Sequence, residues 1–215
     1  EKFLIKFESR LKNEKLYNFE LLKILVKYHH STKKKLAAES NYYKKQSEEE
    51  KDKVWGLLKI IKDADSYSCK ERDVEEQSRR DHSGKVAPLD SIFSQISLGS
   101  KNDKDVKISD KYYRYRINSI NPLYSFPDKF TTLDKNEIID HVMKFENNLP
   151  DFSKLTAFKG MLNVWLNLLE EYTWCIPSDT RYEKSDVSLF DHLRSTSAIA
   201  ACLFNRHILE ISKSK

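Results

Sequence analysis

Apolar residues recur at intervals of three and four in several segments of the chain, and this periodicity limits the fold more than any other feature of the sequence. The longest such stripe runs over residues 155–172, and shorter ones run over 14–30, 54–65, 138–149 and 192–203. These intervals place side chains on one face of an α-helix. We therefore predict a mainly α fold in which each helix buries one apolar face.

Caps and prolines set the expected helix boundaries. In a capping box, the N-cap side chain and a Glu three residues later satisfy exposed backbone N–H groups, and Glu50 and Glu137 each stand at that distance from a cap. A proline cannot continue a helix, so it marks an end. The expected N-caps are Ser47, Asp134, Ser153 and Ser188, and the expected helix-ending prolines are Pro150 and Pro177.

A polar stretch separates the first helices from the later ones. Residues 73–109 are rich in Ser, Asp and Lys around one apolar island at 88–93, and we expect them to be irregular and exposed. Aromatic and basic residues alternate over 111–117, which predicts a short extended (β) excursion around 111–127. This alternation fits a surface that stacks and clamps single-stranded nucleic acid, and equally an amphipathic strand that covers a core.

Composition excludes several classes of protein. The four glycines form neither GxGxxG nor GxxxxGK[ST], so nucleotide binding of those two types is excluded in this stretch. The three cysteines include no CxxC pair, so neither a disulfide framework nor a zinc knuckle is indicated. No apolar run has the length of a membrane span, and we expect a cytoplasmic protein without a membrane partner. The net charge of +5 favours a polyanionic partner only weakly, because the two signs are interspersed.

Three of the stripes contain a side chain that can bind a metal. His29 or His30 continues the row of the first helix, Asp65 continues the row of the second, and His192 lies in the row of the last helix. Burying an unpaired carboxylate is costly, so Asp65 needs a cation or strong hydrogen-bond donors. Imidazoles and a carboxylate that converge from separate helices suit a hydrolytic divalent-metal site.

Each of these residues also has a structural explanation. A histidine in an apolar row is more often a core or interface residue than a ligand, and Asp65 could pair with Arg72. Asp191 follows Ser188 by three residues, so a capping box explains it without any chemistry.

Six strings of residues carry a resemblance to a known family. They are YHH at 28–30, DADSYSCKER at 63–72, PLDSIF at 88–93, LLEEYTWCIPSDT at 168–180, DVSLFDH at 186–192 and TSAIAA at 196–201. In this order they resemble successive landmarks of the large subunit of type III CRISPR-Cas interference complexes, particularly the III-A form. The resemblance extends over nearly the whole chain.

The resemblance implies a helical bundle of the histidine-aspartate (HD) superfamily, circularly permuted so that its usual first His-bearing helix comes last. Residues 1–72 would be the first part of this domain, 73–130 an insertion, 131–210 its helical remainder, and 211–215 the start of a linker to palm domains. His29, His30, Asp65 and His192 would be the catalytic metal ligands. The implied cofactor is a divalent transition metal, namely manganese, nickel, iron or cobalt.

The resemblance also implies partners. The family domain cuts single-stranded DNA within a complex of further subunits, guide RNA and target RNA, while palm domains of the same subunit make cyclic oligoadenylates from ATP. From charge alone, Lys33, Lys34 and Lys35 are candidate phosphate contacts. ATP would be needed only by the palm domains, whose Gly-Gly-Asp-Asp signature this chain lacks.

The sequence departs from the family in one respect. The His-Asp dipeptide that names the superfamily is missing, because Asp81-His82, Asp140-His141 and Asp191-His192 all have the reverse order. We therefore interpret the chain as a fragment and expect it to be weak or inactive as a nuclease. Two alternatives stay open: a non-catalytic helical scaffold that contacts neighbouring subunits and the guide–target duplex, and a free-standing HD phosphohydrolase that acts on small nucleotides.

Overall fold

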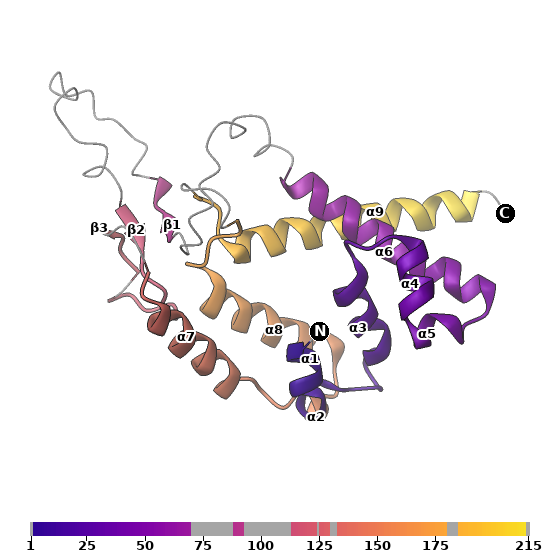
Figure 1. The fold of residues 1–215 in the computed structure, drawn as a ribbon, viewed down its shortest axis with the longest axis horizontal. Coiled ribbons are helices and arrows are strands. Elements are labelled where there is room, and N and C mark those ends of the chain that lie inside the picture. Colours follow the sequence, from indigo (N-terminus) through magenta and orange to yellow (C-terminus); the bar gives the residue numbers. More distant parts are fainter. Residues whose placement is uncertain are drawn as a thin grey trace, which may run out of the picture. The chain divides into compact units, whose positions relative to one another are not determined.

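The computed structural model describes residues 2–69, 88–92, 113–123, 125–129, 133–179 and 185–213. These residues are mainly helical and include a small antiparallel sheet, as the sequence predicts (Figure 1). The chain divides into two compact units, unit 1 with Glu1–Glu71, Pro150–Asn163 and Arg194–Lys215, and unit 2 with Arg72–Leu149 and Val164–Leu193.

Unit 1 is built mostly from helices of the N-terminal part of the chain. Helix α3 packs against α6, and both contribute to one apolar core. The core residues are Ile24, Tyr28, Leu36, Tyr43, Val54 and Leu58. The elements of this part are α1 (Lys2–Lys6), α2 (Glu8–Leu11), α3 (Phe19–Tyr28), α4 (Lys33–Glu39), α5 (Asn41–Lys44) and α6 (Glu48–Cys69). The short 3-10 helix η4 (Phe152–Lys154), the start of α8 (Phe158–Thr173) and most of α9 (Leu189–Lys213) complete the unit.

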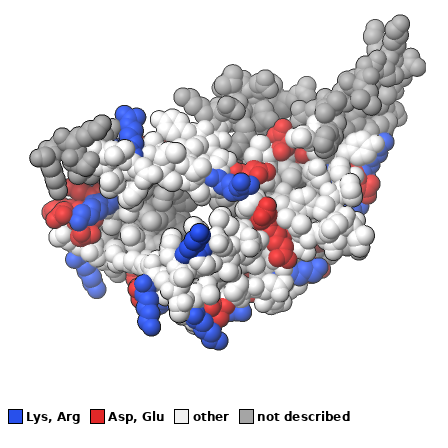
Figure 2. All heavy atoms as spheres, turned by 180° about the vertical axis from the view of Figure 1, so that it is seen from behind, with Lys and Arg blue, Asp and Glu red and all other residues white. Residues whose placement is uncertain are grey.

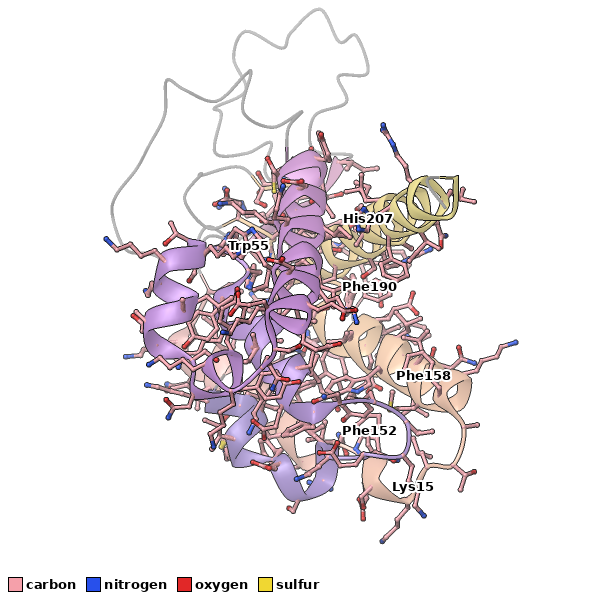
Figure 3. All side chains as sticks on the ribbon, turned by 90° about the vertical axis from the view of Figure 1, so that its right-hand side faces the viewer. Lys15, Trp55, Phe152, Phe158, Phe190 and His207 are labelled. Atoms are coloured by element: carbon pink, nitrogen blue, oxygen red, sulfur yellow. The ribbon has the colours of Figure 1, made fainter. Side chains whose placement is uncertain are left out.

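A buried amide joins two parts of unit 1 that are far apart in the sequence. Asn13 Nδ2 donates to the carbonyl oxygens of Phe152 and Leu155, both at 2.8 Å. Phe152 is completely buried, and Figure 3 shows it near the segment that carries Lys15. Since a buried N–H must find an acceptor, these bonds fix the position of η4 against the N-terminal helices.

Side-chain caps explain where the first helices begin. Asn18 accepts a hydrogen bond from the Leu21 amide, so α3 begins at Phe19 rather than at Glu14, and the predicted start was wrong by one turn. Ser47 Oγ accepts from the Glu50 amide at 3.3 Å, and α6 begins at Glu48 as predicted. Helix α6 continues one turn beyond Asp65, the last residue of the predicted helix.

Unit 2 contains a three-stranded antiparallel sheet in the order β1 (Leu89–Asp90), β2 (Tyr113–Tyr115), β3 (Asp128–Lys129). Leu89 pairs with Tyr115, and Tyr113 pairs with Lys129. Strand β2 confirms the predicted extended excursion. The apolar island was wrongly expected to be exposed, because residues 88–91 are buried and residues 89 and 90 form β1. Apart from 88–92, residues 73–109 lie outside the described part of the chain.

Of the two interpretations of the alternating aromatic and basic residues, the structure of β2 fits the amphipathic strand that covers a core. Arg114 points inward, where its Nε donates to Asp90 Oδ1 at 2.7 Å, and both side chains are almost completely buried. The Tyr115 ring packs edge-on against Trp174. Since Arg114 is held by a buried carboxylate, it is not available to clamp a nucleic-acid backbone.

In the C-terminal half of the chain, two of the three predicted N-caps agree with the structure. Helix α7 (Lys135–Asn147) has the predicted capping box of Asp134 and Glu137. The predicted cap Ser153 was wrong, because Asp151 binds the Ser153 amide and hydroxyl and closes the 3-10 turn of η4. Helix α9 begins after Ser188, whose hydroxyl accepts from the Asp191 amide at 3.0 Å, as predicted. None of the described helices has the length and apolar character needed to cross a membrane.

Candidate metal centre

The paired histidines lie immediately after α3. This helix ends at Tyr28, which is anchored in the core, and His29 is its C-cap residue. His29 Nδ1 lies 2.9 Å from the carbonyl oxygen of Val26, and the two imidazole rings are 4.1 Å apart between centroids. The helix that carries the predicted row therefore ends one residue before His29. The positions of the two histidines are set by the end of this helix.

Asp65 lies on α6, one turn before the helix ends. Its side chain is 27% exposed, and its Oδ2 is 3.9 Å from His30 Nε2. That separation is too long for a hydrogen bond, but it is short enough for one metal ion to bind both atoms. Within unit 1, the structure thus brings together one of the paired histidines and the predicted aspartate.

A pair of hydroxyls links the end of α6 to α9 beside Asp65. Ser68 Oγ donates to the carbonyl oxygen of Asp65 at 2.8 Å and lies 2.9 Å from Thr196 Oγ1. Because the Ser68 proton is directed to that carbonyl, Thr196 is the donor in the second bond. These contacts hold α9 against the last turn of α6.

His192 lies one turn before Thr196 on the same helix, and this spacing directs both side chains to one face of α9. His192 belongs to unit 2. Within unit 1, a carboxylate oxygen of Asp65 and the Sγ atom of Cys69 lie within 4.8 Å of each other, and both residues are partly buried. Cys69 was not predicted from the sequence. Its signal is the interval of four residues from Asp65, which puts the thiol and the carboxylate on one face of α6.

The donor atoms fit a divalent transition metal. Zinc-type ions bind Cys sulfur at about 2.3 Å, and His nitrogen and carboxylate oxygen at about 2.0–2.2 Å, so two ligands of one ion lie at most about 4.5 Å apart. The 3.9 Å between His30 Nε2 and Asp65 Oδ2 meets that limit. An imidazole nitrogen beside a carboxylate oxygen suits zinc, cobalt, nickel or iron better than magnesium or calcium, which prefer oxygen.

The helix end itself favours a cation. The last turn of α6 contains no Lys or Arg, and the C-terminus of a helix carries a partial negative charge that repels the carboxylate of Asp65. A bound cation offsets both the helix charge and the carboxylate charge. The residues of this turn thus provide both donors and a suitable electrostatic environment.

The predicted phosphate contacts lie on the first turn of α4. Lys33 Nζ forms an ion pair with Asp52 Oδ1 at 3.0 Å, and this hydrogen bond raises the pKa of Lys33 above its usual value. Lys34 and Lys35 are exposed. On the face seen in Figure 2, blue and red side chains are interspersed, in keeping with the weak preference for a polyanion inferred from composition.

Two other histidines of the described chain have structural or solvated positions. His141 is buried, and its ring nitrogen Nε2 lies 2.7 Å from the carbonyl oxygen of Tyr172. His207 is exposed on α9 (Figure 3). His82 and Arg72 lie outside the described residues.

Comparison with known proteins supports the family resemblance, although no family model matches the chain. The chain is 33% identical over 132 residues to the CRISPR system single-strand-specific deoxyribonuclease Cas10/Csm1 (subtype III-A) of Methanocaldococcus jannaschii. The match covers 57% of this chain and 15% of that protein, so the chain corresponds to a small part of its relative. The chain is therefore related in sequence to part of a Cas10/Csm1 deoxyribonuclease of type III-A CRISPR systems.

Proposed function

We propose that this chain is the metal-dependent nuclease module, of the permuted HD type, in the large subunit of a type III-A-like CRISPR effector. The observation that carries the proposal is the partly buried Asp65, whose carboxylate lies 3.9 Å from His30 Nε2 in unit 1, in a chain related to a single-strand-specific deoxyribonuclease. In the complete subunit, the substrate is single-stranded DNA, and the partners are further effector subunits, guide RNA and target RNA.

The residues of the centre have separate roles in this proposal. Asp65 and His30 would hold a divalent ion between the ends of α6 and α3. The family resemblance adds His29 and His192 as further ligands. The chemistry that such an ion supplies is polarisation of a phosphoryl oxygen and activation of a bound water. Ser68 and Thr196 position the end of α6 that bears Asp65, because their hydrogen bonds join it to α9.

The lysines of α4 assist binding rather than chemistry. Lys34 and Lys35 lie a few residues after His30, on the first turn of α4, and attract the phosphates of the DNA strand. Lys33 contributes less, because part of its charge is offset by Asp52. This contribution weakens with salt, since each phosphate contact releases counterions from the strand.

The test compares two aspartates of the same helix in the natural polypeptide that contains this chain. Asp65→Asn removes a metal-binding carboxylate without changing its size, and Asp63→Asn makes the same change at an exposed position two residues away. We expect Asp65→Asn to lower Mn²⁺-dependent cleavage of single-stranded DNA by more than about 100-fold, since even outer-shell changes cost about 10–100-fold. Asp63→Asn is expected to keep full activity.

Two results would overturn the proposal. One is equal cleavage by the two variants, which would place the reaction elsewhere. The other is a folded protein, checked by circular dichroism, that binds no divalent ion and leaves single-stranded DNA intact. That second result would favour the non-catalytic scaffold that contacts neighbouring subunits and the guide–target duplex.

A further inference from the structure

The hairpin formed by β2 and β3 in unit 2 exposes large side chains that the candidate metal centre does not use. Tyr113 of β2 is 42% exposed, and Phe126, two residues before β3, is 80% exposed. The intervening residues 117–127 carry no charge, and Ile120 and Leu123 among them are 47% and 80% exposed. Single exposed apolar residues are ordinary on a protein surface, whereas a group of them on one element marks an interaction surface.

Hydrogen bonds within unit 2 hold this loop in place. Trp174 Nε1 donates to the carbonyl oxygen of Asn118 at 2.9 Å, and the Ile120 amide donates to that of Glu171 at 3.1 Å. The side chain and the carbonyl oxygen of Asn121 accept two further hydrogen bonds from the turn that follows, at 2.9 and 2.6 Å. The exposed side chains are therefore carried by a fixed backbone, so a ligand that binds them does not have to order the loop first.

The charge beside Tyr113 is positive. Lys129 is the strand partner of Tyr113, and its Nζ lies over the tyrosine ring, 5.4 Å from the centroid. Neighbouring residues of a strand point to opposite faces of a sheet, so Asp128 is directed away from the face of Lys129. Arg116 already pairs with Glu137. Among the described residues of the hairpin, Lys129 is thus the charge that a ligand on the Tyr113 ring would meet.

Exposed aromatic rings beside a cation suit a single strand of nucleic acid. Unpaired bases stack on aromatic side chains with little regard to sequence, and a cation next to the ring attracts the phosphate of the stacked nucleotide. A double helix keeps its base faces covered by neighbouring bases, so it cannot bind in this way. An apolar protein surface would have to desolvate Lys129 without supplying a counter-ion, which is costly.

We propose that Tyr113, Phe126 and Lys129 form a binding surface for single-stranded DNA, in which one base stacks on each ring and Lys129 contacts a phosphate. The inference rests on the proposed function for the choice of DNA as the strand, and it assigns a binding step to residues other than Asp65 and His30. The three residues hold the strand and take no part in the chemistry, so their loss raises KM and leaves kcat nearly unchanged.

The experiment measures the binding of a fluorescein-labelled oligothymidine by anisotropy, with the natural polypeptide that contains this chain and with EDTA present so that no cleavage occurs. We expect Phe126→Ala and Tyr113→Ala each to raise the Kd at least about fivefold, because each change removes one stacking ring. Tyr113→Phe keeps the ring and should bind like the parent. Lys129→Gln should lower the slope of log Kd against log salt by about 0.7, the value for one phosphate contact of a single strand.

An exposed phenylalanine of unit 1 provides the matched control. Phe204 is 41% exposed on α9, and Phe204→Ala removes the same ring as Phe126→Ala. It should leave the Kd unchanged. Because Phe126 is 80% exposed, its removal takes no side chain out of the core, and a thermal melt like that of the parent is expected.

The failures of the two proposals can be distinguished. Binding like that of the parent by Phe126→Ala and Tyr113→Ala, together with full Mn²⁺-dependent cleavage, would overturn the binding surface and leave the proposed nuclease intact. An equal loss of binding in Phe204→Ala would also overturn it, because the effect would not belong to the hairpin. A folded parent that neither binds nor cleaves the oligonucleotide would overturn both proposals. Hairpin variants that bind DNA normally but no longer associate with a neighbouring subunit would identify a protein interface instead.

Discussion

The buried ion pair of β1 and β2 predicts a large loss of stability when one partner is removed. Arg114 and Asp90 are 2.7 Å apart with side chains only 6% and 2% exposed, so Arg114→Met leaves a carboxylate without its counter-ion in the core of unit 2. Breaking a buried pair on one side costs about 3–5 kcal/mol, mainly as the penalty of the charge left behind. Because native domains are stable by only about 5–15 kcal/mol, this variant would lose a large fraction of its stability.

The adjacent arginine provides a matched control. Arg116 pairs with Glu137 at 3.3 Å, but their side chains are 47% and 37% exposed. Solvent weakens such a pair to roughly 0.2–1 kcal/mol, so Arg116→Met is expected to change the free energy of unfolding by less than about 1 kcal/mol. The two variants make the same chemical change two residues apart in the sequence, and they differ in the burial of the arginine.

Urea unfolding followed by tryptophan fluorescence measures this difference. Trp174 lies in unit 2, where its ring contacts Tyr115 and its Nε1 donates to the Asn118 carbonyl oxygen at 2.9 Å. A background with Trp55→Phe removes the tryptophan of α6 in unit 1 from the signal. Equal free energies of unfolding for the two Arg variants would refute the reasoning. So would a failure of the double variant Asp90→Leu/Arg114→Met to recover stability, since replacing both charges with apolar groups is often neutral.

Three further perturbations have expected outcomes. Asp134→Ala removes the α7 cap and should lower the free energy of unfolding by about 1 kcal/mol in thermal or urea melts, whereas no change would mean that the capping box is dispensable. At pH 8, Cys175 should alkylate far more slowly than Cys202 by mass spectrometry, because raising its pKa from 9.0 to about 11 reduces the reactive thiolate about 100-fold; comparable rates would contradict its burial. Asn13→Ala leaves the carbonyls of Phe152 and Leu155 without their donor, so a loss of about 1–3 kcal/mol is expected, and a loss near zero would show that solvent replaces the amide.

Local hydrogen bonds explain which helix boundaries could be predicted. The caps at Ser47, Asp134 and Ser188 act within three residues, so the sequence alone identifies them. Ser153 was misassigned because Asp151 lies two residues before it and binds its amide first. In each case, the outcome depends on which short polar side chain reaches the first free N–H group.

Contacts between distant residues could not be predicted in the same way. The alternating pattern gave the strand at 113–115, but the inward direction of Arg114 depends on Asp90, which is 24 residues away. In α8, the predicted stripe included Phe158 and Leu162, which are 53% and 43% exposed, whereas Met161 and Leu168 are buried. An apolar helix with residues on several sides does not reveal its buried face until its neighbours are known.

The candidate site contains residues that helical spacing predicts and residues that it does not. Asp65 stands on α6 where helical spacing directs it, and its carboxylate lies 3.9 Å from His30 Nε2. Helix α3 ends at Tyr28, and His29 follows as its C-cap. Cys69 was missed because a cysteine in a polar helix end interrupts no apolar stripe, although its interval from Asp65 could have indicated a shared face.

In the proposed function, the position of Asp65 near the end of α6 couples ion binding to local unfolding. Helix ends open with free energies near zero, and Asp65 keeps its place beside His30 only while this turn is formed. Linkage then requires that the ion protect the turn: at a free concentration about 100 times its dissociation constant, it adds about 2.7 kcal/mol to the cost of opening. Linkage is reciprocal, so an interaction that favours the open turn lowers the ion affinity by the same factor by which the bound ion weakens that interaction. A binding event elsewhere on unit 1 that opens or closes this helix end can therefore set the fraction of molecules that hold an ion.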